Sequence, residues 1–144
     1  MASSKFYSGF FRSLMNKEVD LDTDAIKLLL CTSSYTPDQD THRYKSSITN
    51  EVTGPGYTAG GEAVSNITYS YDATGNVLSF SGDPVAWSAS TITARYGILY
   101  DSTPSTDATR PLILFVDFGG NISSTAATFT VAWDTAGIGA VTLA

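Results

Sequence analysis

The chain is poor in cysteine, in charged residues and in long apolar runs. Its 144 residues include one cysteine, Cys31, which excludes an internal disulfide framework and any multi-cysteine zinc site. Charged residues make up 15% of the chain, well below the usual quarter. The longest apolar runs, Ile26 to Cys31 and Leu112 to Val116, are too short to span a membrane. The N-terminal residues lack the uninterrupted apolar stretch of a secretory signal, so we expect a soluble protein made in the cytoplasm, with no membrane partner.

Basic residues are also scarce. Eight Lys and Arg face fourteen Asp and Glu, a net charge of −6, so we expect no nucleic-acid partner. Residues 1–51 hold six of the eight basic residues, whereas residues 52–144 hold two basic and seven acidic ones. This shift in charge predicts an N-terminal segment whose role differs from that of the remaining chain.

What the sequence does contain is a series of strand patterns separated by turn residues. Strands are predicted over Ala25–Thr32, Asn66–Tyr71, Val77–Ser81, Thr91–Asp101, Leu112–Phe118, Thr128–Asp134 and Ile138–Leu143. The turn Asp72–Asn76 makes the second and third of these a hairpin, and Gly119-Gly120-Asn121 is expected to end the fifth. We predict an all-β fold for residues 21–144, an antiparallel β-sandwich of jelly-roll or immunoglobulin-like type.

Alternation along the strands predicts which side chains form the core. One face of the Thr91–Asp101 strand is expected to point inward throughout, and so are Tyr69 and the apolar residues of the later strands. The predicted core is Ile92, Ala94, Tyr96, Ile98, Leu114, Val116, Phe129, Val131 and Trp133, and Tyr100 and Phe118 are expected in the same inward register.

Two segments read differently. Residues 1–20 are predicted to be a short helical or extended arm, because Phe6, Phe10 and Leu14 recur at helical spacing. That apolar strip either packs on its own domain or docks on a partner. A second short helix is predicted from Thr36 to about Ile48, with Thr36 as its N-cap and Pro37 at its first position.

No residue pattern predicts catalysis. His42 is the one histidine, no Gly-x-Ser-x-Gly nucleophile turn is present, and Cys31 lies in an apolar run. Asp20-x-Asp22-x-Asp24 resembles the start of a calcium loop but lacks the required Gly and bidentate Glu, so an acidic turn is favoured and another form of calcium coordination stays open. We therefore predict no catalytic residue, no cofactor and no metal ligand.

The residues predicted to form an interface fall in two places. The first is the N-terminal strip, which carries large apolar side chains on a short element; the second is a Gly-rich loop that can lie closely against a partner's backbone. The predicted interface residues are Phe6, Phe10, Phe11, Leu14, Gly54, Gly56, Tyr57 and Gly60. The polar loop Ser102–Arg110 is a further candidate contact.

Four segments of the chain carry a family resemblance. Thr32–His42, Asn50–Gly61, Thr91–Tyr96 and Phe129–Asp134 together resemble small structural proteins of tailed double-stranded-DNA bacteriophages, over a match from about Asp20 to the C-terminus. The resemblance implies a virion protein at the capsid surface, such as a capsid decoration (cement) protein, with head-fibre and tail roles as near neighbours. It implies no catalytic or cofactor residues.

Three functions can be weighed on this basis. The leading hypothesis is a non-enzymatic decoration protein that binds the major capsid protein, bridges its subunits and forms a homo-oligomer, a dimer or trimer. The alternative is a head-fibre or tail-associated adhesive module that binds carbohydrate, for which Tyr35, Tyr57 and Trp87 are the candidate aromatics. A hydrolase is disfavoured because no base lies near a nucleophile in the sequence.

Overall fold

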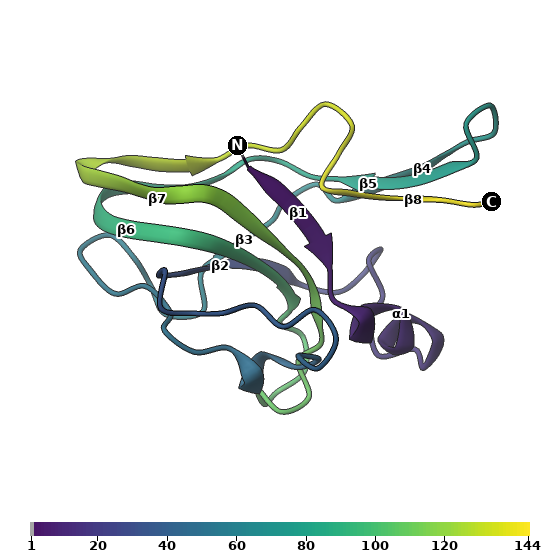
Figure 1. The fold of residues 1–144 in the computed structure, drawn as a ribbon, viewed down its shortest axis with the longest axis horizontal. Coiled ribbons are helices and arrows are strands. Elements are labelled where there is room, and N and C mark those ends of the chain that lie inside the picture. Colours follow the sequence, from purple (N-terminus) through teal and green to yellow (C-terminus); the bar gives the residue numbers. More distant parts are fainter. Residues whose placement is uncertain (1) are drawn as a thin grey trace.

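The computed structural model describes residues 2–144 and contains eight strands, one α-helix and one 3₁₀ helix. The elements are β1 (Ser3–Phe6), α1 (Ser8–Met15), β2 (Ile26–Cys31), η1 (Lys45–Ser47), β3 (Glu62–Ala63), β4 (Thr68–Asp72), β5 (Val77–Ser81), β6 (Val85–Asp101), β7 (Leu112–Val131) and β8 (Gly139–Thr142). One sheet has the order β1-β7-β6-β2-β3 and the other β4-β5-β8, and all strand pairs are antiparallel (Figure 1). The predicted all-β, sandwich-like fold is confirmed.

The long hairpin β6–β7 dominates the larger sheet. Two separate strands were predicted where β7 is continuous, and the expectation that Gly119-Gly120-Asn121 ends a strand is wrong. Instead, Gly119 adopts a φ of 81° and its N–H donates to Asp117 Oδ1 at 2.8 Å. The pairing register shifts opposite this point, between Ala94 and Tyr96. The glycines therefore form a β-bulge, which bends the strand without ending it.

The bulge reverses which side chains face which side of the sheet. Before it, Ile92 and Ala94 pack into a first core; after it, Leu99 does so, while Ile98 and Tyr100 turn to the opposite face. The prediction that all five alternate residues of this strand share one face is therefore wrong. Between the pairs Ala94↔Ile122 and Tyr96↔Asp117, β7 has three more residues than β6. An odd number of extra residues exchanges the two faces, because side chains alternate with a period of two residues in a regular strand.

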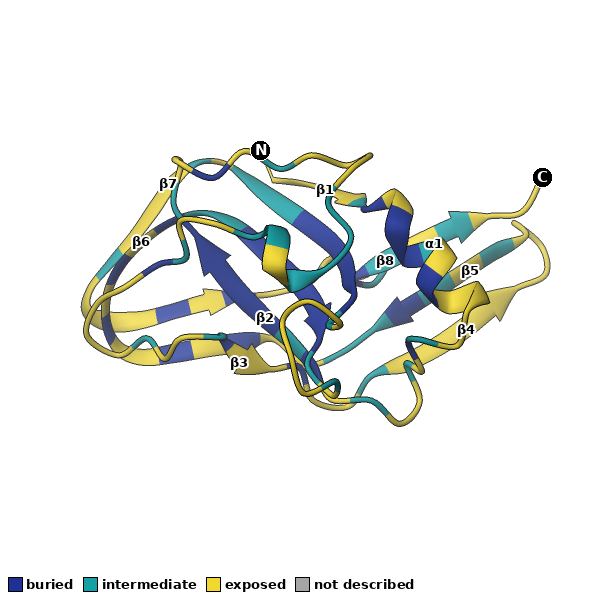
Figure 2. Ribbon diagram, turned by 90° about the horizontal axis from the view of Figure 1, so that it is seen from below, coloured by how far each residue is buried: buried dark blue, intermediate teal, exposed yellow. Residues whose placement is uncertain are grey.

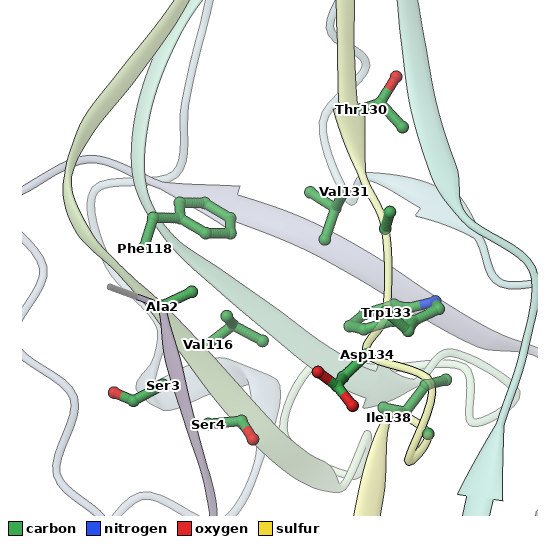
Figure 3. Close-up of a pocket in the computed structure, with 12 residues that line it drawn as sticks. Ala2, Ser3, Ser4, Val116, Phe118, Thr130, Val131, Trp133, Asp134 and Ile138 are labelled. Atoms are coloured by element: carbon green, nitrogen blue, oxygen red, sulfur yellow. The ribbon is translucent and has the colours of Figure 1, made fainter.

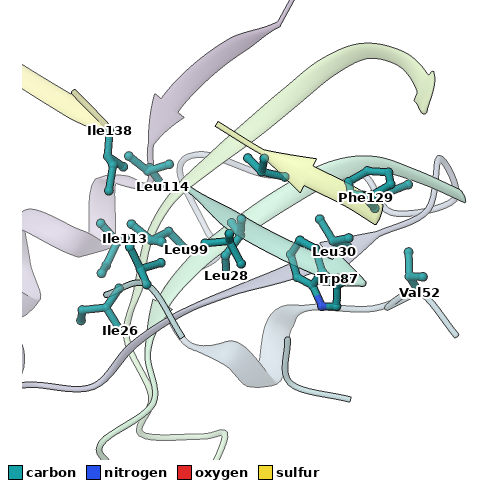
Figure 4. Packing of buried hydrophobic residues seen from close by; sticks show 14 of the residues in the cluster. Ile26, Leu28, Leu30, Val52, Trp87, Leu99, Ile113, Leu114, Phe129 and Ile138 are labelled. Carbon is teal, nitrogen blue, oxygen red and sulfur yellow. The ribbon is translucent and has the colours of Figure 1, made fainter. Parts of the chain in front are cut away.

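Both faces of the larger sheet are consequently covered. The first core, part of which Figure 4 shows, includes Ile26, Leu28, Leu30, Trp87, Leu114 and Phe129. The second core consists of Tyr7, Leu29, Cys31, Tyr35, Ile98, Tyr100, Leu112 and Phe115. This double burial explains the unbroken apolar run of β2, since a strand covered on both faces need not alternate.

The prediction of a helix from Thr36 to about Ile48 is wrong, because this segment forms turns and one 3₁₀ turn, η1. The carboxylate of Asp38 accepts hydrogen bonds from the backbone N–H groups of Asp40 and Thr41, both at 3.0 Å. Asp favours such local turns over helix interiors because its side chain competes for backbone donors. His42 Nδ1 lies 2.9 Å from the hydroxyl of Tyr35, which anchors the segment on the second core.

The predicted N-terminal arm packs on the protein's own body. Its first residues form β1, which pairs with β7 from Ser3↔Asp117 to Phe6↔Leu114. The helix α1 therefore covers only Ser8–Met15 of the predicted arm. Phe10 is 3% exposed and Val19 6%, and both belong to the first core. Neither helix in residues 2–144 is long and apolar enough to cross a bilayer.

Most of the predicted core is confirmed, but several aromatics are not deeply buried. Tyr69 is 59% exposed, so its predicted inward position is wrong. Tyr96, Val116, Phe118 and Trp133 are half-buried. Trp133 lies just beyond the end of β7, where its indole N–H donates to the carbonyl of Asp83 at 2.9 Å.

Candidate functional site: an apolar groove

An apolar groove of about 640 Å³ lies between α1 and one face of the smaller sheet. Figures 1 and 2 show α1 lying across that face of the β4-β5-β8 sheet. Apolar and aromatic side chains from both sides line it: Phe6, Phe10, Phe11, Leu14, Val19, Leu21, Tyr69, Leu78, Phe80 and Val141.

Strand register puts the apolar side chains of the smaller sheet on this face. Tyr69 pairs with Phe80 and Tyr71 with Leu78, and Leu78 also pairs with Val141. Directly paired residues share a face, and so do residues two apart in one strand. The opposite face carries small and polar residues, among them Ser70 and Ser79, whose hydroxyls lie 3.3 Å apart.

Aromatic rings form the floor of the groove. The ring centroid of Phe6 is 5.5 Å from that of Phe10, 5.3 Å from Phe11 and 6.3 Å from Phe80. The close approach of this cluster to β8 requires Gly139, where a Cβ atom would lie 2.6 Å from Phe6 Cζ and 2.9 Å from Phe80 Cε1. A larger residue at this position would displace the ring of Phe6.

The groove coincides with the main exposed apolar surface of residues 2–144. Seven large apolar side chains are exposed in this part of the chain, and six of them belong to α1, to the smaller sheet or to its C-terminal extension; Leu14, Tyr69 and Leu78 line the groove itself. These six are Leu14, Met15, Tyr69, Tyr71, Leu78 and Leu143; the seventh, Ile122, lies on β7. Clustered apolar exposure of this kind marks interaction sites, whereas single exposed apolar residues do not.

The charged rim of the groove is mainly acidic. Asp20 and Asp22 line it together with Lys17, and none of the three takes part in a salt bridge among the described residues. The carboxylate of Asp20 accepts a hydrogen bond from the Asp22 N–H at 2.9 Å, which holds both acids in the turn before β2. The groove therefore suits an apolar ligand that carries positive charge.

The two parts of the predicted interface lie at different places. Phe6, Phe10, Phe11 and Leu14 all line the groove, although Phe10 is so buried that it forms only its floor. The sequence does not reveal the opposite wall, because the alternation of β4 predicts a strand that faces the protein's own core. Whether that strand is exposed depends on where its sheet lies in the fold, and the local sequence pattern does not predict this.

The Gly-rich loop contributes nothing to the groove and packs on the larger sheet. Its Tyr57 hydroxyl accepts from the N–H of Leu30 at 3.0 Å and donates to Glu51 at 2.8 Å. Cβ atoms at Gly54 and Gly56 would lie within 2.7 Å of the β6 backbone. Gly60 donates its N–H to the Glu51 carboxylate at 2.6 Å. The close contact expected of these glycines is thus made within the chain.

Two other hollows carry no catalytic grouping. One, of about 410 Å³, lies between β1 and the end of β7, and Asp134 is its single charged residue (Figure 3). The other, of about 310 Å³, joins the Gly-rich loop to the Ser102–Arg110 loop, where the Asp107 carboxylate pairs with Lys45 and Arg110 at 2.9 and 2.8 Å.

The candidate reactive groups are held in structural roles. Burial raises the pKa of the Cys31 thiol to about 12, so the nucleophilic thiolate is suppressed. Tyr35 and Trp87, two of the three candidate sugar-binding aromatics, are 1% and 2% exposed. Burial, reinforced by the neighbouring Asp24 carboxyl, raises the pKa of Asp101 to about 6. Nowhere in residues 2–144 do three His, Cys, Asp or Glu side chains converge closely enough to hold a metal ion.

Comparison with models of protein families, with curated proteins and with solved structures found no match to this chain.

Proposed function

We propose that the protein is a non-enzymatic structural protein of a bacteriophage virion, a capsid decoration protein that binds the outer shell and bridges subunits of the major capsid protein. The apolar groove is the observation that carries this proposal, because three of the seven exposed large apolar side chains of the described residues line it, and three more lie on the elements that form it or on the C-terminal extension of β8. The family resemblance of the sequence points to the same class of protein.

The occupant we propose for the groove is an extended segment of the major capsid protein. Such a segment would place apolar side chains against Leu14, Tyr69 and Leu78, and a lysine or arginine beside Asp20 and Asp22. Burying two or three apolar side chains releases about 1.5–3 kcal/mol each, before the cost of ordering the segment is subtracted. One groove therefore gives modest affinity.

Avidity converts modest affinity into occupancy. A dimer or trimer of the chain would present two or three grooves, and each engaged groove raises the effective concentration of the next. A protein that binds the assembled shell more tightly than free subunits stabilises the shell by linkage, without any chemical step.

The proposal is tested with capsids assembled without this protein. Leu78→Asp places a charge in the groove, and we expect it to weaken binding to these capsids at least about tenfold. Ile122→Asp is the matched control, since Ile122 is 47% exposed and Leu78 44%, but Ile122 lies outside the groove. Equal binding of the two variants to capsids would show that the groove is not the binding surface.

A second measurement addresses the decoration role itself. Capsids that lack the protein should assemble but release DNA at a lower temperature than decorated capsids. If both particles lose DNA at the same temperature, the protein does not act as a cement.

A carbohydrate-binding adhesive module is the second candidate, and the exposed pair Tyr69 and Tyr71 favours it. The two rings are 59% and 52% exposed on one strand face, and the Tyr71 hydroxyl donates to Asn76 at 2.9 Å, which orients that side chain. Exposed tyrosine rings offer apolar faces on which sugars stack. Binding to an array of bacterial surface glycans, lost in Tyr69→Ser, together with no binding to capsids, would select this candidate.

A further inference from the structure

Two carboxyl groups meet where the turn at Asp20–Asp24 joins the end of β6. Ile26 pairs with Asp101 across β2 and β6, and the Ser102 N–H donates to the carbonyl of Ala25 at 2.8 Å. The Ala25 N–H in turn donates to Thr103 Oγ1 at 2.8 Å. These backbone contacts hold Asp24 beside Asp101.

One carboxylate oxygen of Asp101, Oδ2, is buried without a hydrogen-bond partner among the described residues. Its residue is 0% exposed; Oδ1 accepts the N–H of Thr103 at 2.8 Å, whereas Oδ2 is buried with no partner within the described chain. No Lys, Arg or His among residues 2–144 forms a salt bridge with Asp101 or Asp24. A buried carboxylate oxygen without a donor or a cation is rare in native proteins.

Hydrogen bonds within the turn Asp20–Asp24 fix its conformation. Asp24 Oδ2 accepts the N–H of Asp20 at 2.7 Å, and Asp20 Oδ1 accepts the N–H of Asp22 at 2.9 Å. Asp24 is half-buried, so one member of the pair is partly exposed to solvent. These hydrogen bonds fix the Asp24 carboxylate on one side, and the pairing of β2 with β6 fixes Asp101 on the other.

We propose that Asp24 and Asp101 bind one calcium ion that joins the start of β2 to the end of β6. Calcium accepts carboxylate, carbonyl, hydroxyl and water oxygens in flexible geometry, so two carboxylates from the chain suffice when water completes the shell. A site with so few charged ligands belongs to the weak range of extracellular modules, with a Kd of about 0.1–1 mM. This inference stands apart from the proposed capsid binding.

The test is a calcium titration of the full chain at pH 7.5, in buffer cleared of divalent ions and at constant ionic strength. We expect 10 mM CaCl₂ to raise the Tm by about 4 °C or more, and isothermal titration calorimetry to show one site. Asp101→Asn and Asp24→Asn should each weaken calcium binding at least about tenfold. Asp22→Asn is the matched control, because it removes an exposed acid of the same turn and should leave binding unchanged.

Three results would overturn the proposal. A Tm that is indifferent to calcium, combined with a higher Tm for Asp101→Asn, would mean that the two carboxyls share a proton. A calcium effect that survives in Asp101→Asn would place the ion elsewhere. An equal effect of MgCl₂ would indicate general screening of the acidic chain.

Discussion

The two sheets of the molecule use the same strand geometry for opposite purposes. In the larger sheet, five of the six residues of β2 are buried, whereas β4 of the smaller sheet has no buried residue. The sequences differ accordingly: β2 reads Ile-Lys-Leu-Leu-Leu-Cys and β4 reads Thr-Tyr-Ser-Tyr-Asp. Figure 2 shows the contrast, with β2 coloured mainly as buried and β4 as exposed.

The difference separates the sheet that buries its apolar side chains from the sheet that exposes them. Strict alternation in β4 is typical of a strand with one face covered, yet its apolar face opens into the groove. In the larger sheet, the apolar side chains of both faces are buried within the chain, in the two cores. The smaller sheet retains apolar surface that a partner can cover.

The largest expected effect is in the larger sheet, at Trp87. This side chain is 2% exposed, with its ring centroid 5.9 Å from Tyr57 and 6.0 Å from Phe129. Trp87→Ala should lower the free energy of unfolding by about 3–5 kcal/mol, because it leaves a large cavity. Denaturant unfolding measures this, and Tyr69→Ala in the smaller sheet should change the same quantity by no more than about 0.5 kcal/mol. A similar decrease in the free energy of unfolding in both variants would show that the two sheets do not differ in their contribution to stability.

The same contrast separates what sequence could and could not predict. Strand positions, the β4–β5 hairpin and most of the first core follow from alternation and turn residues, which are local. The continuous β7 and the reversed facing after Ala94 depend on a bulge shared by two strands, so neither strand's sequence reveals it alone. Half of the groove was predicted from the apolar strip of α1, and the other half required knowing that the smaller sheet lies opposite it.

An intermediate effect is expected in local stability. β4, β5 and β8 share few buried side chains with the rest of the molecule, whereas β2 lies between β6 and β3 and between two cores. Amide hydrogens of the smaller sheet should therefore exchange through local opening, with protection about 100-fold or more below that of β2. Hydrogen exchange followed by NMR tests this. Equal protection in both sheets would show that they unfold as one unit.

The smallest expected effect concerns the ion pair beside the bulge of the larger sheet. Asp117 accepts hydrogen bonds from Arg95 Nε at 2.7 Å, from Arg95 Nη2 at 3.2 Å and from the Gly119 N–H at 2.8 Å. The Arg95 guanidinium and the backbone donor hold the pKa of this carboxyl below its usual value.

The folded state therefore binds fewer protons at the Asp117 carboxyl than the unfolded state does. The stabilisation is complete above the unfolded pKa of about 3.9 and is lost as pH falls through the folded pKa. Because both side chains are 29% exposed, solvent screening keeps the gain small. Thermal unfolding of the wild type and of Asp117→Asn should differ most above about pH 5 and converge toward pH 3. Arg95→Gln should reproduce the same convergence, and parallel curves for either variant would show that the pair does not stabilise the bulge.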